Sequence, residues 1–364
     1  MDANVQELTA MAEKLNIDSG TPKYSTNWRE AIEGMWAATG RAYYNPKIDT
    51  NWCHLPMEMR SECIKWMDFE TRMRMRRTSK TEKSLVESAK KMQVYRLRLC
   101  FRDYDLCMRV QTIDKDEKLT EIIRLWTTGD HRDTLKRVSL ILKFCDVQIF
   151  DFMFNSAKDS DSELVCKVLS ATAPFRFKTF RTNCESFNWQ LTHFFLKHCE
   201  GLENFQTYFD SYQGVHLDRY INLPSFDNAN VYLHGMLYEM ESTYELVQKW
   251  IDNDAKIGTL LCFYRENFLR NETKELFAEK FKDRVISRND SEIRIRTDNA
   301  SKHIILSFCR PPYDLPYAVE GEADTFYYYS CHIIASDLLE FKDDGKWFIE
   351  SDKWIDDSWY APSF

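Results

Sequence analysis

The sequence predicts a mixed protein of the α+β or α/β class: a small three-helix domain, then strand–helix units, then a β-rich C-terminal part. Three observations predict it. Residues 51–91 carry apolar side chains at helical spacing. From about residue 138, short β-like runs alternate with amphipathic helical stretches. The last hundred residues contain alternating β patterns and a hairpin turn.

The composition is that of a folded chain, with 24 Phe, 18 Tyr and 10 Trp against 10 Gly and 9 Pro in 364 residues. The closest glycines, Gly34 and Gly40, are too far apart for a P-loop or a dinucleotide-binding fingerprint. The sequence contains neither a Cys-x-x-Cys pair nor a Gly-x-Ser-x-Gly motif. We therefore expect no catalytic residues, no cofactor and no metal.

The chain is expected to be intracellular, in the cytoplasm and/or the nucleus. No apolar run is long enough to span a membrane, and the polar N-terminus lacks the basic and apolar regions of a secretory signal. Eleven cysteines, an odd number, are typical of reduced thiols. The net charge of −8 gives no general argument for nucleic acid or an acidic membrane surface as a partner.

The chain divides into three predicted parts: residues 1–48, 49–92 and 93–364. The first is expected to be a helical extension of two helices, which ends at Asn45-Pro46. In the second, Leu55-Pro56 marks the start of a helix, because proline is favoured at the first helical position. Behind it lies one apolar stripe, formed by Met59, Cys63, Ile64 and Met67.

Two further helices are predicted in the same segment. Asp68 can cap a short helix that holds Met73 and Met75. Ser79 and Glu82 form a capping box that opens a third helix, with Leu85, Val86 and Ala89 on its apolar face. Three such short helices cannot bury a full core of their own. Their remaining apolar surface must be covered by the rest of the chain or by a partner.

The order of these residues resembles an F-box, and in particular the large, diversified F-box family of nematodes. Boxes of that family often run R-x-x-L-R-x-T-S-K-x-E-R-x-L-V, which Arg72 to Val86 resembles, with Met75 where leucine is usual and Lys83 at the last arginine position. The segments Lys249–Ile251, Ala255–Gly258 and Ile293–Thr297, the last followed by His303–Leu306, resemble parts of the domain that follows such boxes. Residues 93–364 would then be an F-box-associated domain.

The resemblance implies a non-catalytic substrate receptor of a Skp–cullin–F-box ubiquitin ligase. The box would bind the Skp-type adaptor, and through it a cullin, while residues 93–364 would recruit an unknown protein substrate. For Ile64 and Leu85, a purely internal core position stays open as the alternative. The residues that match positions packing on the adaptor or holding the box together are Leu55, Pro56, Met59, Ile64, Met67, Met73 and Leu85.

The third part is predicted to begin with a hairpin. Residues 95–102 form a half-buried strand in which arginines at 96, 98 and 102 alternate with Leu97, Leu99 and Phe101. Asp103-Tyr-Asp105 can turn the chain into a second strand, Leu106 to Ile113.

Strand–helix units are predicted over about 138–265, with helices at Glu163–Leu169, Phe187–Cys199 and Thr243–Ile251. The spacing of about 26 to 30 residues is typical of leucine-rich-repeat-like units, although the consensus leucines and the Asn or Cys step are absent. An ordinary α/β domain with regular element lengths is the alternative. The β-like runs are centred near Phe150, Phe177, Phe205, Tyr232 and Leu261. Their outward residues Lys178, Gln206, Tyr208 and Tyr232 are candidates for substrate contact.

A β-rich end is predicted over about 282–350. Arg284–Ile286 and Glu292–Arg296 flank the polar turn Arg288-Asn-Asp, with Ile293 and Ile295 facing inward and Arg294 and Arg296 in water. Residues 303–308 continue the sheet, and an acidic, aromatic tail follows.

The sequence also allows two other classes of function to be considered. From Arg60 to Arg102 the chain carries 13 Lys and Arg against 5 Asp and Glu, which allows a nucleic-acid-binding or other interaction module. The arginines at 72, 74, 76 and 77 and Lys80 are instead expected on a solvated face. A metal site at His193, His198 and Cys199 is disfavoured, because the two histidines are five residues apart rather than four.

Overall fold

The computed structural model describes residues 52–102, 105–113, 118–155, 159–184, 189–208, 217–236, 240–266, 270–309 and 326–338. The predicted helical extension over 1–48 and the aromatic residues beyond 338 lie outside these ranges. The described residues form two compact units. The first consists of those within 52–93, 112–120 and 144–146, and the second contains the rest.

The first unit contains the three predicted helices, α3 (Met57–Trp66), α4 (Phe69–Met75) and α5 (Lys80–Ser88), after a short 3-10 turn, η1 (Trp52–His54). Pro56 directly precedes α3. Asp68 caps α4, where its Oδ1 accepts from the Thr71 N–H at 2.7 Å, and Ser79 caps α5, where its hydroxyl accepts from the Glu82 N–H at 3.2 Å. The helix starts predicted from the capping residues are confirmed.

Arg72 differs from the prediction of a solvated side chain, because its residue is only 7% exposed. Its Nε donates to the Met67 carbonyl at 3.1 Å, while Nη2 and Nη1 donate to the carbonyls of Lys65 and Lys90 at 2.8 and 2.9 Å. Lys65 lies near the end of α3, and Lys90 follows α5. One guanidinium therefore joins the C-terminal ends of two helices from its position on the third.

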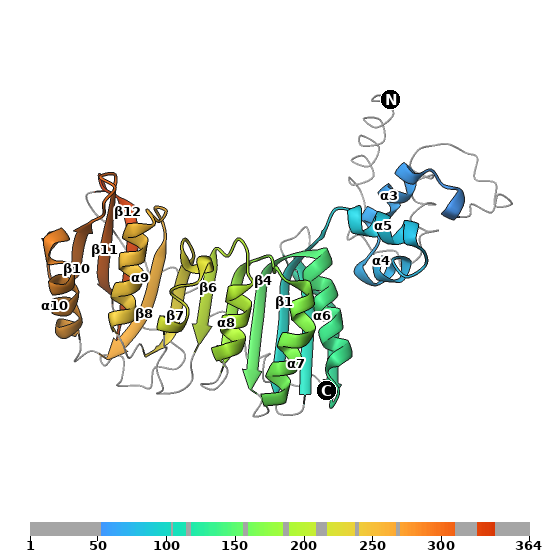
Figure 1. Ribbon diagram of the computed structural model, residues 1–364, viewed down its shortest axis with the longest axis horizontal. Coiled ribbons are helices and arrows are strands. Elements are labelled where there is room, and N and C mark those ends of the chain that lie inside the picture. The colour runs from blue at the N-terminus through green and yellow to red at the C-terminus, as the bar shows by residue number, and fades with distance from the viewer. Residues whose placement is uncertain are drawn as a thin grey trace, which may run out of the picture. The chain divides into compact units, whose positions relative to one another are not determined.

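The second unit is built on one sheet, whose strand order is β3-β2-β1-β4-β5-β6-β7-β8-β12-β11-β10-β9. The helices α6 to α10 cover one face of it (Figure 1). The strands are β1 (Met92–Arg102), β2 (Asp105–Ile113), β3 (Leu119–Thr128), β4 (Cys145–Asn155), β5 (Phe177–Cys184), β6 (Asn204–Tyr208), β7 (Asn230–Met236), β8 (Leu260–Glu266), β9 (Val285–Arg288), β10 (Glu292–Arg296), β11 (Lys302–Cys309) and β12 (Phe326–Ala335). The helices are α6 (Arg132–Phe144), α7 (Asp159–Leu169), α8 (Trp189–Lys197), α9 (Met240–Asp252) and α10 (Arg270–Lys280).

Strands β4 to β8 are parallel and adjacent in chain order. Their register aligns five fully buried residues: Phe150, Phe180, Phe205, Val231 and Leu261. The β-like runs predicted around Phe150, Phe205 and Leu261 are therefore centred on equivalent positions of their strands. The run predicted near Phe177 is displaced, because that residue begins β5 and Phe180 occupies the equivalent position.

The helix-covered face of the sheet is packed with aromatic rings. Phe195 of α8 lies 5.1 Å from Phe150, 4.9 Å from Phe152 and 5.5 Å from Phe180, measured between ring centroids. All four side chains are fully buried. A single helical residue therefore fills the space above two neighbouring strands.

A polar ladder runs along the starts of three parallel strands. The Asn204 Nδ2 donates to the Thr179 hydroxyl at 3.3 Å, and the Asn230 Nδ2 donates to the Asn204 Oδ1 at 3.0 Å. Sequence inspection did not identify this ladder, because the three residues lie 25 and 26 positions apart without a shared motif. The side-chain amides tie successive strand–helix units together.

The flanking strands are antiparallel, as predicted for both hairpins: β1 pairs with β2, and β10 with β9 and β11. Ile293 and Ile295 are fully buried, and Arg296 is exposed, as expected. Arg294 is half-buried instead of solvated, because its guanidinium donates to the Ser336 and Leu338 carbonyls and to His303 Nδ1.

The prediction that β1 is half-buried is wrong. Arg96 and Arg98 are buried, and both guanidinium groups bind the carboxylate of Asp151 on β4. Strand β1 lies next to β4, which places the Asp151 side chain within reach of Arg96 and Arg98. The sequence pattern alone could not identify a carboxylate more than 50 residues away as their partner.

We expect Arg72→Met to lower the local stability of α3–α5 by about 3 kcal/mol, because it removes three charge-assisted hydrogen bonds and leaves the carbonyls of Met67, Lys65 and Lys90 without this donor. Native-state hydrogen exchange of peptides from residues 57–88 measures this change. The control is Arg74→Met, an exposed arginine of the same helix. Equal hydrogen-exchange protection in the Arg72 and Arg74 variants would contradict the role of Arg72 in joining the three helices.

Phe195→Ala is expected to lower the free energy of unfolding of the sheet unit by about 3–5 kcal/mol, since it opens a cavity above β4 and β5. Urea denaturation, monitored by tryptophan fluorescence, measures this free energy of unfolding. The control Leu276→Ala removes a partly exposed side chain of α10 and is expected to change the midpoint little. A Phe195 variant as stable as this control would refute the packing argument.

Candidate protein-interaction site

Glu82 holds the beginning of α3 against α5. Its Oε1 accepts from the Trp52 Nε1 at 3.2 Å and from the Arg60 Nη1 at 3.1 Å, and its Oε2 accepts from the Ser79 hydroxyl. Glu82 itself is buried. Because Trp52 and Arg60 lie on either side of Leu55-Pro56, the carboxylate fixes the position of the turn that carries these two residues.

Part of the predicted adaptor-binding set lies on the surface at the start of α3. Leu55 and Met59 are half-exposed, Pro56 is exposed, and the neighbouring Met57 is 54% exposed. We call Leu55, Pro56, Met57 and Met59 the apolar turn. Sequence reasoning missed Met57, since it lies outside the apolar stripe of α3. Its position directly after Leu55-Pro56 was the available signal.

The other predicted residues form the interior of the three-helix unit. Ile64 is fully buried, and Met67, Met73 and Leu85 are nearly so. Within this chain alone, these four side chains hold the helices together. The internal position that the sequence left open for Ile64 and Leu85 is the one observed here. A second exposed apolar side chain, Trp66, lies at the end of α3.

The predicted substrate-contact residues are only partly brought together. Gln206 and Tyr232 lie opposite each other on β6 and β7, in one row with Asp151, Arg181 and Cys262. Lys178 lies instead at the start of β5, where its Nζ pairs with the Glu203 carboxylate at 2.9 Å. Tyr208 aligns with Asn183 and His234, and its side chain is outside the described set.

Many cations of the basic segment 60–102 are engaged within the chain. Arg60 pairs with Glu82, Arg76 with Glu87, and both Arg96 and Arg98 with Asp151. Arg60 and Arg76, each neutralised by a carboxylate of its own, are poor phosphate ligands, which weakens the nucleic-acid hypothesis for the helical part of this segment.

The histidines of α8 and its end make ring contacts: His193 lies 6.1 Å from Trp189, and His198 lies 5.1 Å from Phe194. Burial, together with the charges of Lys197 and His198, lowers the pKa of His193. Among the described residues, no group of three or more His, Cys, Asp or Glu could hold a metal ion, and no helix is long and apolar enough to cross a membrane.

Comparison with known proteins yields one finding. A model of the F-box domain matches residues 52–93. No curated protein and no solved structure matches the chain. The matched range begins at η1 and ends after α5, so it contains the apolar turn, Glu82 and Arg72. Residues 52–93 are therefore an F-box domain.

Proposed function

We propose that this protein is a substrate receptor of a Skp–cullin–F-box ubiquitin ligase. The observation that supports this most directly is the F-box domain at residues 52–93, a domain that binds a Skp-type adaptor and through it a cullin. Its apolar turn is exposed at the start of α3, where a second polypeptide can cover it.

The proposed adaptor contact is the apolar turn. The buried side chains of Ile64, Met67, Met73 and Leu85 hold together the three helices of the domain that carries it. Apolar side chains at an interface contribute most when the partner removes them fully from water. Glu82 and Arg72 hold the three helices in place, so the turn needs little ordering when it binds.

The chain is proposed to act without bond chemistry of its own. It would hold a target protein near a conjugating enzyme, so that ubiquitin transfer gains from a raised effective concentration. Residues 93–364 would be the F-box-associated part that recruits the target, as their resemblance to the nematode family suggests.

We also propose that the strand–helix units over about 138–265 are leucine-rich-repeat-like. The five parallel strands in chain order and the Thr179–Asn204–Asn230 ladder support this arrangement. Such units present a continuous sheet face along which a protein target can lie.

The double variant Leu55→Asp, Met57→Asp is expected to weaken binding of a purified Skp-type adaptor by about tenfold or more, because it places charges in an apolar contact. Pull-down and calorimetry of the full chain with the adaptor measure the loss. Ile64→Asp is unsuitable for this purpose, since a charge at a fully buried position would unfold the domain.

The matched control is Ile257→Asp, Ile286→Asp, which changes two similarly exposed apolar residues of the sheet unit. Circular dichroism verifies that both double variants are folded. Wild-type adaptor binding by the Leu55, Met57 variant would exclude the apolar turn as the contact.

A further inference from the structure

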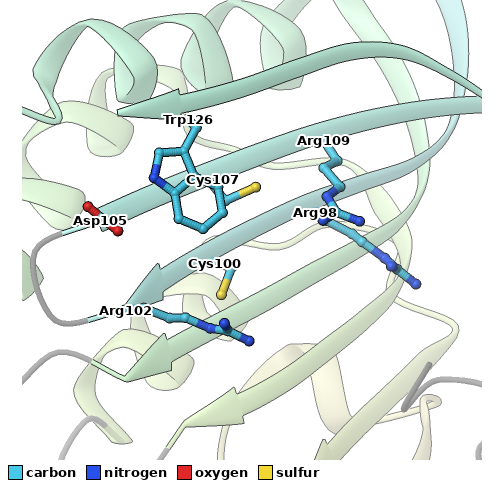
Figure 2. A pocket seen from close by; sticks show the side chains of 7 residues that line it. All are labelled: Arg98, Cys100, Arg102, Asp105, Cys107, Arg109 and Trp126. Atoms are coloured by element: carbon cyan, nitrogen blue, oxygen red, sulfur yellow. The ribbon is translucent and has the colours of Figure 1, made fainter. Parts of the chain in front are cut away.

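A hollow lies on the helix-free face of β1, β2 and β3 (Figure 2). Strand pairing sets its residues opposite each other, with Arg98 facing Arg109, Cys100 facing Cys107 and Arg102 facing Asp105. Trp126 of β3 also lines it and is 50% exposed. We call this the arginine hollow. Its lining residues are Arg98, Cys100, Arg102, Asp105, Cys107, Arg109 and Trp126.

The middle of the arginine hollow is apolar and uncharged. Cys100, Cys107 and Met153 are buried together, and the Cys100 Sγ donates to the Met153 Sδ at 3.4 Å. Burial raises the pKa of the Cys100 thiol to about 11, so the thiol is protonated near neutral pH. The charge of the hollow is therefore set by the side chains around these sulfur atoms.

Those surrounding side chains are predominantly cationic. On this face of β1, β2, β4 and β5, alternation places five arginines, at 96, 98, 102, 109 and 181, against only Asp105 and Asp151. The local excess of positive charge contrasts with the net charge of −8 for the whole chain. This face is therefore complementary to an anion.

Part of the excess charge is buried. Arg96 and Arg98 share the single carboxylate of Asp151, so two cations meet one anion. The pKa of Arg98 is lowered, first by burial and then by the neighbouring charges of Arg96 and Arg109, although Asp151 opposes this change. The Nη2 of Arg96, a residue 93% buried, has no hydrogen-bond partner among the described residues. Two guanidinium groups against one carboxylate leave a net positive charge at the edge of the arginine hollow, which Arg98 lines.

We propose that the arginine hollow binds an anionic segment of a protein substrate, with carboxylate or phosphate groups against the arginines and an apolar side chain against Trp126. This rests on the proposed function, because it names the class of target that the receptor takes. A protein segment fits better than a nucleic acid, since Asp105 borders the hollow and the chain as a whole is acidic.

Fluorescence polarisation with labelled ten-residue peptides tests the proposal on the full chain. The probes are an all-glutamate peptide, a Ser–Gly peptide carrying two phosphoserines, its unphosphorylated form and an all-glutamine peptide. A single-stranded DNA of twelve nucleotides is the fifth probe. The variant is Arg102→Gln, Arg109→Gln, and the matched control is Arg288→Gln, Arg296→Gln, two exposed arginines of β9 and β10.

The glutamate peptide, the phosphopeptide or both are expected to bind, and the preferred one identifies the anionic group. The Arg102, Arg109 variant is expected to lose about tenfold or more in affinity, and the control less than about twofold. The proposal is overturned if neither anionic peptide binds, if the glutamine peptide binds as well, if both variants lose equally, or if the DNA binds more tightly at the same arginines.

Adaptor binding is measured in parallel on the same preparations. Adaptor binding without peptide binding overturns the arginine hollow and leaves the receptor role intact. Peptide binding without adaptor binding overturns the receptor role and leaves the arginine hollow intact as an anion-binding site. Because Arg102 and Arg109 lie outside the F-box domain, their substitution is expected to leave adaptor affinity unchanged.

Discussion

The buried guanidinium of Arg72 is the interaction on which the F-box domain depends. Helices of 10, 7 and 9 residues are too short to be stable by themselves. From its position on α4, Arg72 joins the C-terminal ends of α3 and α5 through three carbonyls, and Glu82 joins the start of α3 to α5. Ile64, Met67, Met73 and Leu85 fill the interior of the domain, whereas the apolar turn lies on its surface.

The sheet unit separates structural and candidate functional residues by face. Side chains such as Phe150, Phe180 and Phe205 point to the helices and form the aromatic core. The alternate residues, among them Arg98, Arg181 and Gln206, lie on the opposite face. The period-two alternation of a strand produces this division directly.

Local signals predicted the fold well where their causes are local. Asp68, Ser79 and Glu82 marked the helix starts, because a cap acts within a few residues. Recurring aromatic runs located most of the parallel strands. The burial of Arg72, Arg96 and Arg98 could not be predicted, since their partners are backbone carbonyls and an aspartate that only the tertiary fold brings near. Strand β3 and helices α6 and α10 were missed. Met57 is exposed and Ile64 buried because of how the three helices pack, although the position of Met57 after Leu55-Pro56 was a local signal.

Hydrogen–deuterium exchange of the full chain with and without a purified Skp-type adaptor tests the central claim, that an apolar turn held by Arg72 and Glu82 is the docking surface. The account predicts slower exchange in peptides covering residues 52–66 when the adaptor is present, with strands β5 to β7 unchanged. Protection confined to the sheet, or unchanged exchange across residues 52–66 in a mixture that forms the complex, would contradict it.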